Sequence, residues 1–394
     1  MTGSNGKTTT VRLLAAMCVA HGWVTAQSGT DGVRVADAML AEGDWAGPAG
    51  ARLALRDVRT EAAVFETARG GMLRRGLAVA GARTAIVTNV QADHFGEYGV
   101  DDLQALAAVK LVLAKGLAAD GILVLNGDDP VLRAAAADRS GRTAWFSLDA
   151  DAPCIAAGRA GGAAVAWRAS DGVLRLSADG TEWTLGAECD LPLAAGGIAR
   201  FNVSNMLAAS LGAWGMGIAP STIAAVLATF GAARGDNPGR LMRWHMAGVT
   251  VLLDYAHNPD GLTALLAVAE SLRGRNGRLL LLLGQAGNRD DDSIRALARA
   301  AAAAKPAVIA LKELPDFLRG RARGEVPRLL DAALRNAGQA AASIVLHEDE
   351  AAAAQALAMQ ARAGDVVVLP VHGRAARTAV IDWLDARERS LPAP

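Results

Sequence analysis

The segment Gly3-Ser4-Asn5-Gly6-Lys7-Thr8-Thr9-Thr10, followed by a helical run from Val11, constrains the fold of this chain most strongly. Glycines allow successive backbone N–H groups to point at a phosphate, lysine adds positive charge, and a threonine hydroxyl can bind magnesium. We interpret the segment as a phosphate-binding loop, although its spacing is shorter than GxxxxGK[ST]. A glycine turn capped by threonines is the alternative. The sequence shows no strand ahead of the loop, so we expect that strand either to lie upstream of this start or to be lacking.

The rest of the first half predicts the sheet that such a loop requires. Short apolar runs alternate with longer stretches of helical period, which is typical of a doubly wound α/β protein. We expect strands at 62–66, 84–89 and 121–126, with a helix across 100–117. Parallel strands would place their carboxyl ends at one edge of the sheet, where ligands of such sheets bind.

The pattern changes twice further along the chain. Short alternating segments between 141 and 193 predict an antiparallel β insertion, and the glycine-containing stretch 231–239 predicts a linker. After it, strands are expected at 249–254, 278–284, 307–311, 343–346 and 365–370. We therefore expect a P-loop-type parallel-sheet domain at 1–235, followed by a smaller Rossmann-like α/β domain at 236–394.

Composition excludes several classes of protein. A chain of 394 residues, at roughly 150 per domain, has room for two or three domains. With 52% hydrophobic and 20% charged residues it is not mainly disordered. Forty Lys and Arg balance forty Asp and Glu, so no net field favours nucleic acid or an anionic membrane. Three dispersed cysteines indicate no disulfide framework, and the absence of a signal pattern leads us to expect a cytoplasmic protein.

Two polar residues follow predicted neighbouring strands. Glu66 stands at the end of 62–66, and His94 follows 84–89 in Thr88-Asn89-Val90-Gln91-Ala92-Asp93-His94. If the two strands are neighbours in a parallel sheet, both side chains lie near the phosphate loop. A carboxylate and a neutral imidazole there suit a divalent metal, so we expect them to help bind one.

Together these motifs resemble the Mur ligase family of ATP-dependent amide ligases, which includes enzymes of peptidoglycan peptide assembly and folylpolyglutamate synthase. The resemblance rests on GSNGKTTT, the Glu66 segment, TNVQADH and Asp254-Tyr255-Ala256-His257-Asn258-Pro259-Asp260. Within the family the chain is most similar to the carboxyl-terminal, Mur-ligase-like half of cyanophycin synthetases. That likeness is carried by ETARGGMLRRGL, DWAGPAGARLALRD at 44–57, FNVSNMLAA at 201–209, DNPGR at 236–240 and LRGRARGEV at 318–326. The sequence does not include the ATP-grasp half of those enzymes, and its last strand ends in an unexpectedly basic PVHGR.

The resemblance implies specific roles. ATP and Mg²⁺ are the implied cofactors. The residues expected to bind nucleotide are Ser4, Asn5, Gly6, Lys7, Thr8, Thr9, Asn202, Arg240, Asp254 and His257. Those expected to bind metal are Thr8, Glu66, His94 and Lys110, the last as a carbamylated lysine. Those expected to be catalytic are Lys7, Glu66, His94 and Arg240.

Several of these assignments have a structural alternative. Asn202 is equally well explained as a helix N-cap, and Asp254 as a strand-end cap. Lys110, among alanine and valine, is alternatively a solvated helix lysine. The mixed-charge segment with Arg319, Arg321, Arg323, Glu325, Glu313 and Asp316 is either a binding loop for a cationic amine or a solvated loop.

The function that the resemblance implies is amide formation between a carboxylate and an amine through an acyl phosphate. The expected amine is an amino acid such as arginine, and the expected acceptor is an aspartyl or peptide carboxylate. A separate ATP-grasp ligase would then make the acceptor, and a homo-oligomer is compatible with the sequence. The alternatives are a non-catalytic nucleotide-binding partner of another ligase and a ligase acting on a cell-wall precursor.

Overall fold

The computed structural model describes residues 1–92 and 98–391. The chain divides into two compact units, Met1–Asp236 and Asn237–Pro394. Each unit has its own sheets and its own hydrophobic core. No helix in the described part of the chain is both long and apolar enough to cross a membrane.

The first unit begins with a four-stranded sheet in the order β3-β2-β1-β4. Its strands are β1 (Thr25–Gly29), β2 (Gly32–Val35), β3 (Ala38–Glu42) and β4 (Ala62–Phe65). β1, β2 and β3 form an antiparallel meander, whereas β4 pairs with β1 in parallel. β4 therefore ends at Phe65 and presents Glu66 just beyond the sheet.

A six-stranded sheet in the order β10-β9-β8-β7-β6-β5 forms the larger part of the first unit. Its strands are β5 (Ala82–Val87), β6 (Leu117–Asn126), β7 (Thr143–Ser147), β8 (Val165–Arg168), β9 (Val173–Ala178) and β10 (Thr181–Ala187). β5 through β8 pair in parallel, and β8 through β10 pair antiparallel.

The region 141–193 contains the antiparallel strands that the sequence predicts, β8, β9 and β10, but it also contains β7 and a helix. β7 pairs in parallel with both β6 and β8, so antiparallel pairing begins only at β8. The reason is helix α6 (Pro153–Gly161), which connects β7 to β8 and supplies the crossover that parallel strands need. The strands of 141–193 therefore extend the six-stranded sheet of the first unit.

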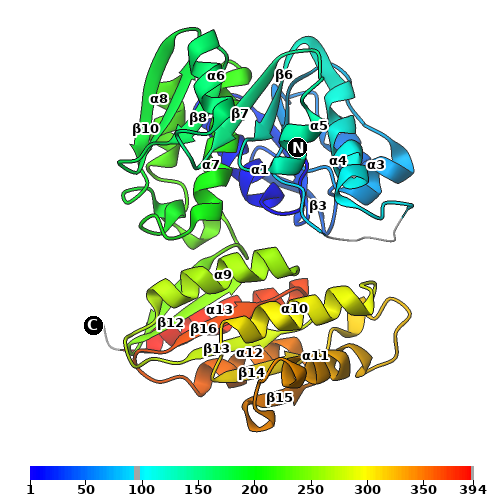
Figure 1. The fold of residues 1–394 in the computed structure, drawn as a ribbon, viewed down its shortest axis with the longest axis vertical. Coiled ribbons are helices and arrows are strands. Elements are labelled where there is room, and N and C mark those ends of the chain that lie inside the picture. The colour runs from blue at the N-terminus through cyan, green and yellow to red at the C-terminus, as the bar shows by residue number, and fades with distance from the viewer. Residues whose placement is uncertain (93–97, 392–394) are drawn as a thin grey trace. The chain divides into compact units, whose positions relative to one another are not determined.

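Helices pack on these sheets, and α1 lies against α7 in the core (Figure 1). α7 is buried along most of its length, so its sequence shows no polar face. Apart from α1 and α7, the helical elements of this unit, α6 included, are short. The bounds are α1 (Lys7–Ala20), α2 (Pro48–Ala54), α3 (Arg69–Arg75), α4 (Leu103–Leu111), η1 (Val112–Gly116), α5 (Pro130–Ala135), η2 (Pro192–Ala194), α7 (Arg200–Gly215), α8 (Pro220–Leu227) and η3 (Arg234–Asp236).

β4 and β5 belong to different sheets, contrary to the expectation that they are neighbours. Met1 and Thr2 lie between them: the Met1 amino group donates to Phe65 O at 2.6 Å, and the Thr2 N–H donates to Ile86 O at 2.9 Å. Thr2 also forms a parallel bridge with Val87. The phosphate loop thus starts from a two-residue link between the sheets.

The second unit has one six-stranded sheet in the order β11-β12-β16-β13-β14-β15. The five strands from β12 to β16 are parallel to one another, and β11 pairs antiparallel with β12 at one edge of the sheet. The strands are β11 (Met242–Met246), β12 (Val249–Asp254), β13 (Leu279–Leu283), β14 (Val308–Lys312), β15 (Ile344–His347) and β16 (Val366–Pro370).

Helices cover both faces of this sheet (Figure 1). Leu280 and Leu282 of β13 share a core cluster with side chains of α12 and α13, so alternate residues serve the opposite face, where α9, α10 and α11 follow one another. The bounds are α9 (Pro259–Leu272), α10 (Asp291–Ala303), η4 (Pro315–Phe317), α11 (Glu325–Asn336), η5 (Ala341–Ser343), α12 (Glu350–Met359) and α13 (Arg374–Ser390).

Candidate functional site

Two glycines allow the phosphate loop to pack against neighbouring side chains. A Cβ on Gly3 would lie 1.9 Å from Thr88 Oγ1, and a Cβ on Gly6 would lie 2.2 Å from Asn205 Oδ1. Gly6 also has φ 83°, in the left-handed region, immediately before α1. Only glycine can adopt this φ at position 6 and also leave room for the Asn205 side chain without strain.

The residues after β5 hold the loop from the other side. The N–H of Asn5 donates to Asn89 Oδ1 at 2.8 Å, and the N–H of Ser4 donates to Asn89 O at 3.1 Å. The N–H of Gln91 donates to Ser4 Oγ at 3.0 Å, and Thr88 Oγ1 donates to Asn5 O at 2.6 Å. The predicted TNVQ segment therefore positions the loop backbone.

Positive charge gathers where the loop enters α1. Lys7 Nζ lies across the loop and donates to Gly3 O at 3.0 Å and Ser4 O at 3.1 Å. The first-turn N–H groups of an α-helix lack intrahelical acceptors and carry the positive end of its dipole. Loop, lysine and helix terminus together make a site suited to phosphate.

A carboxylate and two hydroxyls meet beside this helix terminus. Thr8 Oγ1 donates to Glu66 Oε2 at 3.0 Å, and Thr30 Oγ1 donates to Glu66 Oε1 at 3.1 Å. Glu66 is only 2% exposed. These oxygens suit Mg²⁺, which takes one or two protein carboxylates together with phosphate and water. Residues 1–92 and 98–391 contain no group of three or more His, Cys, Asp or Glu able to hold a metal, and His94 lies outside the described residues.

Sequence reasoning missed three further residues near this carboxylate: Thr30, Asp31 and Asp44. Desolvation raises the pKa of Asp44, as do the charges of Glu66 and Asp31, whereas the Ala46 N–H and the Lys7 charge oppose the rise. Asp31 forms an ion pair with Arg12 at 2.6 Å. Asp44 opens the resemblance stretch 44–57 and was detectable there, whereas Thr30, in the β1–β2 turn, carries no sequence signal.

Asn202 and Asn205 lie on α7, buried near Gly6. Asn202 is not the N-cap, because α7 begins at Arg200 with Ala199 at the cap. Its Nδ2 donates to Leu193 O at 3.0 Å, and its Oδ1 accepts from Asn205 Nδ2 at 3.2 Å. The pair therefore forms a buried polar strip on α7.

Lys110 is not a solvated helix lysine. It belongs to α4 and is only 4% exposed. A buried ammonium group needs hydrogen-bond or charged partners that offset the loss of its hydration. The carbamylation expected from the resemblance stays a prediction.

In the second unit, a cluster around Tyr255 forms where β12 ends; we call it the Tyr255 cluster. The guanidinium of Arg240 stacks 4.5 Å from the centre of the Tyr255 ring, and that of Arg377 lies 5.6 Å from it. His257 and His372 contact the ring edge to face, at 5.6 and 5.3 Å between centroids. The two guanidinium groups outnumber the one carboxylate of the cluster, that of Asp254, so the cluster is basic overall.

Asp254 fixes the backbone at the start of this unit. Its Oδ2 accepts the Leu241 N–H at 2.7 Å, which positions the residue next to Arg240. Desolvation raises the pKa of Asp254, and the Arg240 charge opposes that rise. His257 Nδ1 lies 3.1 Å from Tyr255 O, and a carbonyl only accepts, so Nδ1 carries the proton.

A buried ion pair supports the other side of the Tyr255 cluster. Lys312 Nζ bonds to Glu350 and to Pro370 O, and the same carboxylate accepts the N–H groups of His372 at 2.8 Å and Gly373 at 2.7 Å. Desolvation, with the Lys312 charge, holds the pKa of His372 well below its usual value. His372 is therefore neutral, and its Nε2 donates to Ala256 O at 3.0 Å.

The mixed-charge loop is fixed at its base and exposed at its tip. Arg321 pairs with Asp291 at 2.9 Å and Glu325 at 2.7 Å. Glu313 is buried and accepts the N–H groups of Leu314 and Gly324. Asp316 is exposed and therefore accessible to a ligand, whereas Glu313 is not.

The fold and these motifs define a class of protein. The profile of the Mur ligase middle domain matches residues 1–213, and that of the Mur ligase glutamate ligase domain matches residues 239–370. The chain belongs to the Mur ligase family.

Within this family the chain is similar to curated cyanophycin synthetases. It is 38% identical over 333 residues to that of Geminocystis herdmanii, covering 84% of this chain and 37% of the relative. To that of Synechocystis sp. it is 35% identical, covering 94% and 42%. The chain thus spans about two fifths of these relatives. A UDP-N-acetylmuramoyl-L-alanyl-D-glutamate–2,6-diaminopimelate ligase of Xanthomonas oryzae is 32% identical, with 95% and 71% covered.

Solved structures share the fold at lower identity. The folylpolyglutamate synthase of Mycobacterium tuberculosis superposes with a TM-score of 0.69 at 18% identity, covering 97% of this chain and 90% of the other. Escherichia coli FolC gives 0.67 at 18% identity, covering 99% and 89%. The expected α/β architecture, with a nucleotide-binding domain and a Rossmann-like domain, is confirmed.

Proposed function

We propose that this protein is an ATP- and Mg²⁺-dependent ligase that joins a carboxylate to an amine. The observation that carries the proposal is the convergence of the Lys7 loop with the Thr8–Glu66 pair at the start of α1. Positive and metal-binding groups meet there as phosphoryl transfer requires. Family membership supports the same reaction class.

The reaction has two balanced steps. The acceptor carboxylate attacks the γ-phosphorus of ATP, which forms an acyl phosphate and releases ADP. The amine then attacks the acyl carbon, loses a proton and expels phosphate, which leaves an amide. Both partners of the first step are anionic, so charge neutralisation is the main demand on the protein.

Residues of the first unit meet that demand. Lys7 and the loop N–H groups would bind the β- and γ-phosphates, with Ser4, Asn5, Gly6 and Thr9 forming the surrounding loop. Thr8, Glu66, His94 and carbamylated Lys110 would hold Mg²⁺, which supplies charge neutralisation at the phosphoryl oxygens. Asn202 would contact the adenine.

Residues of the second unit would complete nucleotide binding. Arg240, stacked on Tyr255 and beside Asp254, presents a guanidinium held in one orientation, as recognition of a γ-phosphate requires. Asp254 and His257 would contact the nucleotide. The basic Tyr255 cluster supports an anionic ligand at this edge of the sheet.

For the substrates, we propose an amino acid such as arginine as the amine and an aspartyl or peptide carboxylate as the acceptor. Similarity to cyanophycin synthetases supports this choice. The exposed Asp316 is available to a cationic side chain. A separate ATP-grasp ligase would supply the acceptor, and assembly into a homo-oligomer is part of the same proposal.

The test is to supply ATP, Mg²⁺, arginine and an aspartyl peptide, and to follow phosphate release together with product mass. The expected result is release that requires both substrates and a product heavier by one arginine residue. No ATP turnover with any amine and acceptor pair would favour a non-catalytic nucleotide-binding partner.

The similarity to a diaminopimelate ligase supports one further candidate function. The same assay with diaminopimelate and UDP-N-acetylmuramoyl-L-alanyl-D-glutamate distinguishes the two. Turnover with this pair, and none with arginine, would identify a ligase of cell-wall precursors.

A further inference from the structure

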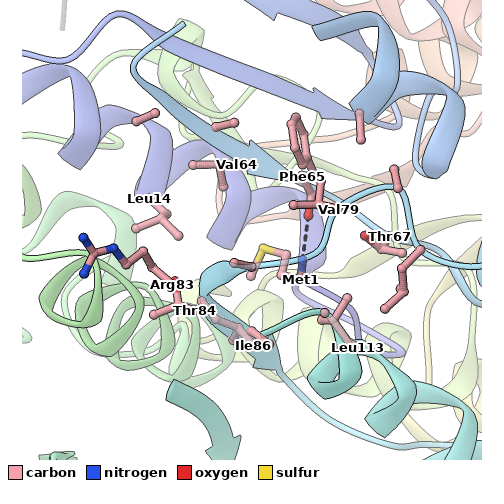
Figure 2. Close-up of a pocket in the computed structure, with 18 of the residues that line it drawn as sticks. Met1, Leu14, Val64, Phe65, Thr67, Val79, Arg83, Thr84, Ile86 and Leu113 are labelled. Atoms are coloured by element: carbon pink, nitrogen blue, oxygen red, sulfur yellow. Dashed lines mark hydrogen bonds between the residues drawn. The ribbon is translucent and has the colours of Figure 1, made fainter. Parts of the chain in front are cut away.

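A cavity and a polar network are buried outside the phosphate loop. The cavity surrounds Met1 in the first unit, and Figure 2 shows side chains such as Leu14, Val64 and Leu113 lining it. Because that lining is mainly apolar, it offers few groups that could orient a reactant. The polar network lies in the second unit, at the carboxyl ends of β14 and β16, and it contacts the Tyr255 cluster.

The network begins at Lys312 and Glu350. Both side chains are buried, and the Lys312 ammonium bonds to Glu350 and to Pro370 O. Two glycines leave room for this pair. A Cβ on Gly284 would lie 2.5 Å from Lys312 Cγ, and a Cβ on residue 373 would lie 2.7 Å from Glu350 Oε2. Close packing on both sides therefore holds the pair in one arrangement.

Glu350 fixes the backbone where β16 leads into α13. Its Oε1 accepts the His372 N–H at 2.8 Å, and its Oε2 accepts the Gly373 N–H at 2.7 Å. One buried carboxylate thus binds two adjacent N–H groups, and Lys312 binds that carboxylate. This arrangement sets the direction in which the His372 side chain leaves the backbone.

The His372 ring links this backbone to the residues after β12. Its Nε2 donates to Ala256 O at 3.0 Å, and the ring packs edge to face with Tyr255 at an interplanar angle of 84°. Desolvation and the Lys312 charge lower the pKa of His372, so the ring is neutral and has a single N–H. The bond to Ala256 O places that proton on Nε2.

Tyr255 in turn supports the guanidinium of Arg240, which stacks 4.5 Å from the centre of its ring. Gln285 Nε2 donates to His257 O at 3.0 Å and holds the other end of the same turn. His372 differs from Gln285 because it bonds to the turn and also packs against the ring on which Arg240 stacks. It therefore connects the buried ion pair to Arg240.

We propose that His372 is a positioning residue of the amide-forming reaction: by donating to Ala256 O and packing against Tyr255, it holds the ring on which Arg240 stacks. The buried Lys312–Glu350 pair holds His372 itself. The inference rests on the ligase function proposed above, and it adds the means by which the Arg240 guanidinium keeps one orientation. Such placement matters, because moving a reacting or binding group by about 1 Å can lower a rate by about 10²-fold.

The test uses three variants of the full chain. His372→Gln places its amide nitrogen near the position of Nε2, so it can still donate to Ala256 O. His372→Asn is one methylene shorter and places its nitrogen near the position of Nδ1, so it does not reach that carbonyl. His245→Asn, at an exposed histidine of the same unit, is the control.

We expect kcat to fall by about tenfold or more in His372→Asn, and to stay within about threefold of wild type in His372→Gln and His245→Asn. In the Arg240→Ala background, His372→Asn should add little further loss, because both changes remove the same contribution. Equal kcat in His372→Asn and His372→Gln would overturn the proposal. So would a loss in His372→Asn that multiplies with that of Arg240→Ala.

NMR decides the inference without turnover. An aromatic ring shifts the resonances of groups stacked on its face, so in protein with isotope-labelled arginine the Arg240 side-chain N–H should resonate upfield. His372→Asn should move this resonance toward its random-coil position, whereas His372→Gln should not. An unchanged resonance in His372→Asn would contradict the proposal.

The wild-type protein provides a measurement that needs no variant. Imidazole nitrogen spectra should show His372 neutral with its proton on Nε2, and a proton on Nδ1 alone would overturn the proposal. Absence of turnover by the wild-type protein with every substrate pair would refute the proposed ligase function instead. The two NMR measurements would still decide whether His372 holds Tyr255 and Arg240 in place.

Discussion

At the residue scale, Lys7 offers the most direct test of the phosphate loop. Lys7→Ala removes the ammonium that lies across Gly3 O and Ser4 O. Because this charge would stabilise the transferring phosphoryl group, we expect turnover to fall by about 10²-fold or more. Phosphate release measures the loss. Lys115→Ala, at an exposed lysine of η1, is the matched control and should keep full activity. Full activity in Lys7→Ala would contradict the role.

The Met1 amino group predicts a pH dependence of stability. Its pKa is about 5 when folded and 8.0 when unperturbed, so between these values the unfolded chain binds more protons. Stability should therefore rise from pH 5 to pH 8, by up to roughly 4 kcal/mol. Urea denaturation of the protein with a free Met1 amine measures this rise. Acetylation of that amine should remove it, whereas an identical slope after acetylation would refute the assignment.

Residue types alone predicted some contacts and missed others. The pairing of Thr8 with Glu66 was foreseeable because a helix start and a strand end were both recognisable. Thr30 was not, because its bond to Glu66 depends on a turn between β1 and β2 that has no motif. Lys110 was expected in solvent as one alternative, since α4 gives no local sign of which face packs inward.

At the scale of elements, the strands that were predicted are those whose sequences form apolar runs. β13 and β16 were predicted to within two residues at each end because strands buried on both faces of a parallel sheet read as unbroken apolar runs. β1, β2 and β3 were missed. The largely buried β1 (TAQSG) and the largely exposed β3 (AMLAE) both contain small or polar residues, so neither forms an unbroken apolar run. The antiparallel strands β8, β9 and β10 were expected, but β7 and its parallel pairing with β6 and β8 were missed, because local patterns do not report partners.

The buried Lys312–Glu350 pair predicts how β14, α12 and the end of β16 depend on one another. Glu350→Ala would leave the Lys312 ammonium with only a carbonyl partner and strip the His372 and Gly373 N–H groups of their acceptor. We expect a loss of about 3–5 kcal/mol in unfolding free energy, measured by urea denaturation. Glu348→Ala, at an exposed neighbour, should change it by less than about 0.5 kcal/mol. A comparable loss in both variants would contradict the argument.

At the scale of the whole molecule, the chain divides into its two compact units after Asp236, inside the stretch 231–239, which has the glycine and proline of a linker. The bridge made by Met1 and Thr2 was not foreseeable. It depends on two strands from different sheets approaching one short segment, which no local pattern encodes.

The proposed reaction links the two units through Lys7 and Arg240. If both stabilise the charge on one transferring phosphoryl group, they act on one step, and residues that act as a unit have non-additive effects. We expect Arg240→Ala to lower turnover by about 10²-fold or more, as Lys7→Ala does. The double variant should lose clearly less than the product of the single losses. Steady-state phosphate release measures all three, with circular dichroism to verify folding. Arg275→Ala, at an exposed arginine of the same unit, is the control and should combine with Lys7→Ala without coupling. Single losses that multiply, or full turnover in Arg240→Ala, would show that Arg240 serves the Tyr255 cluster alone.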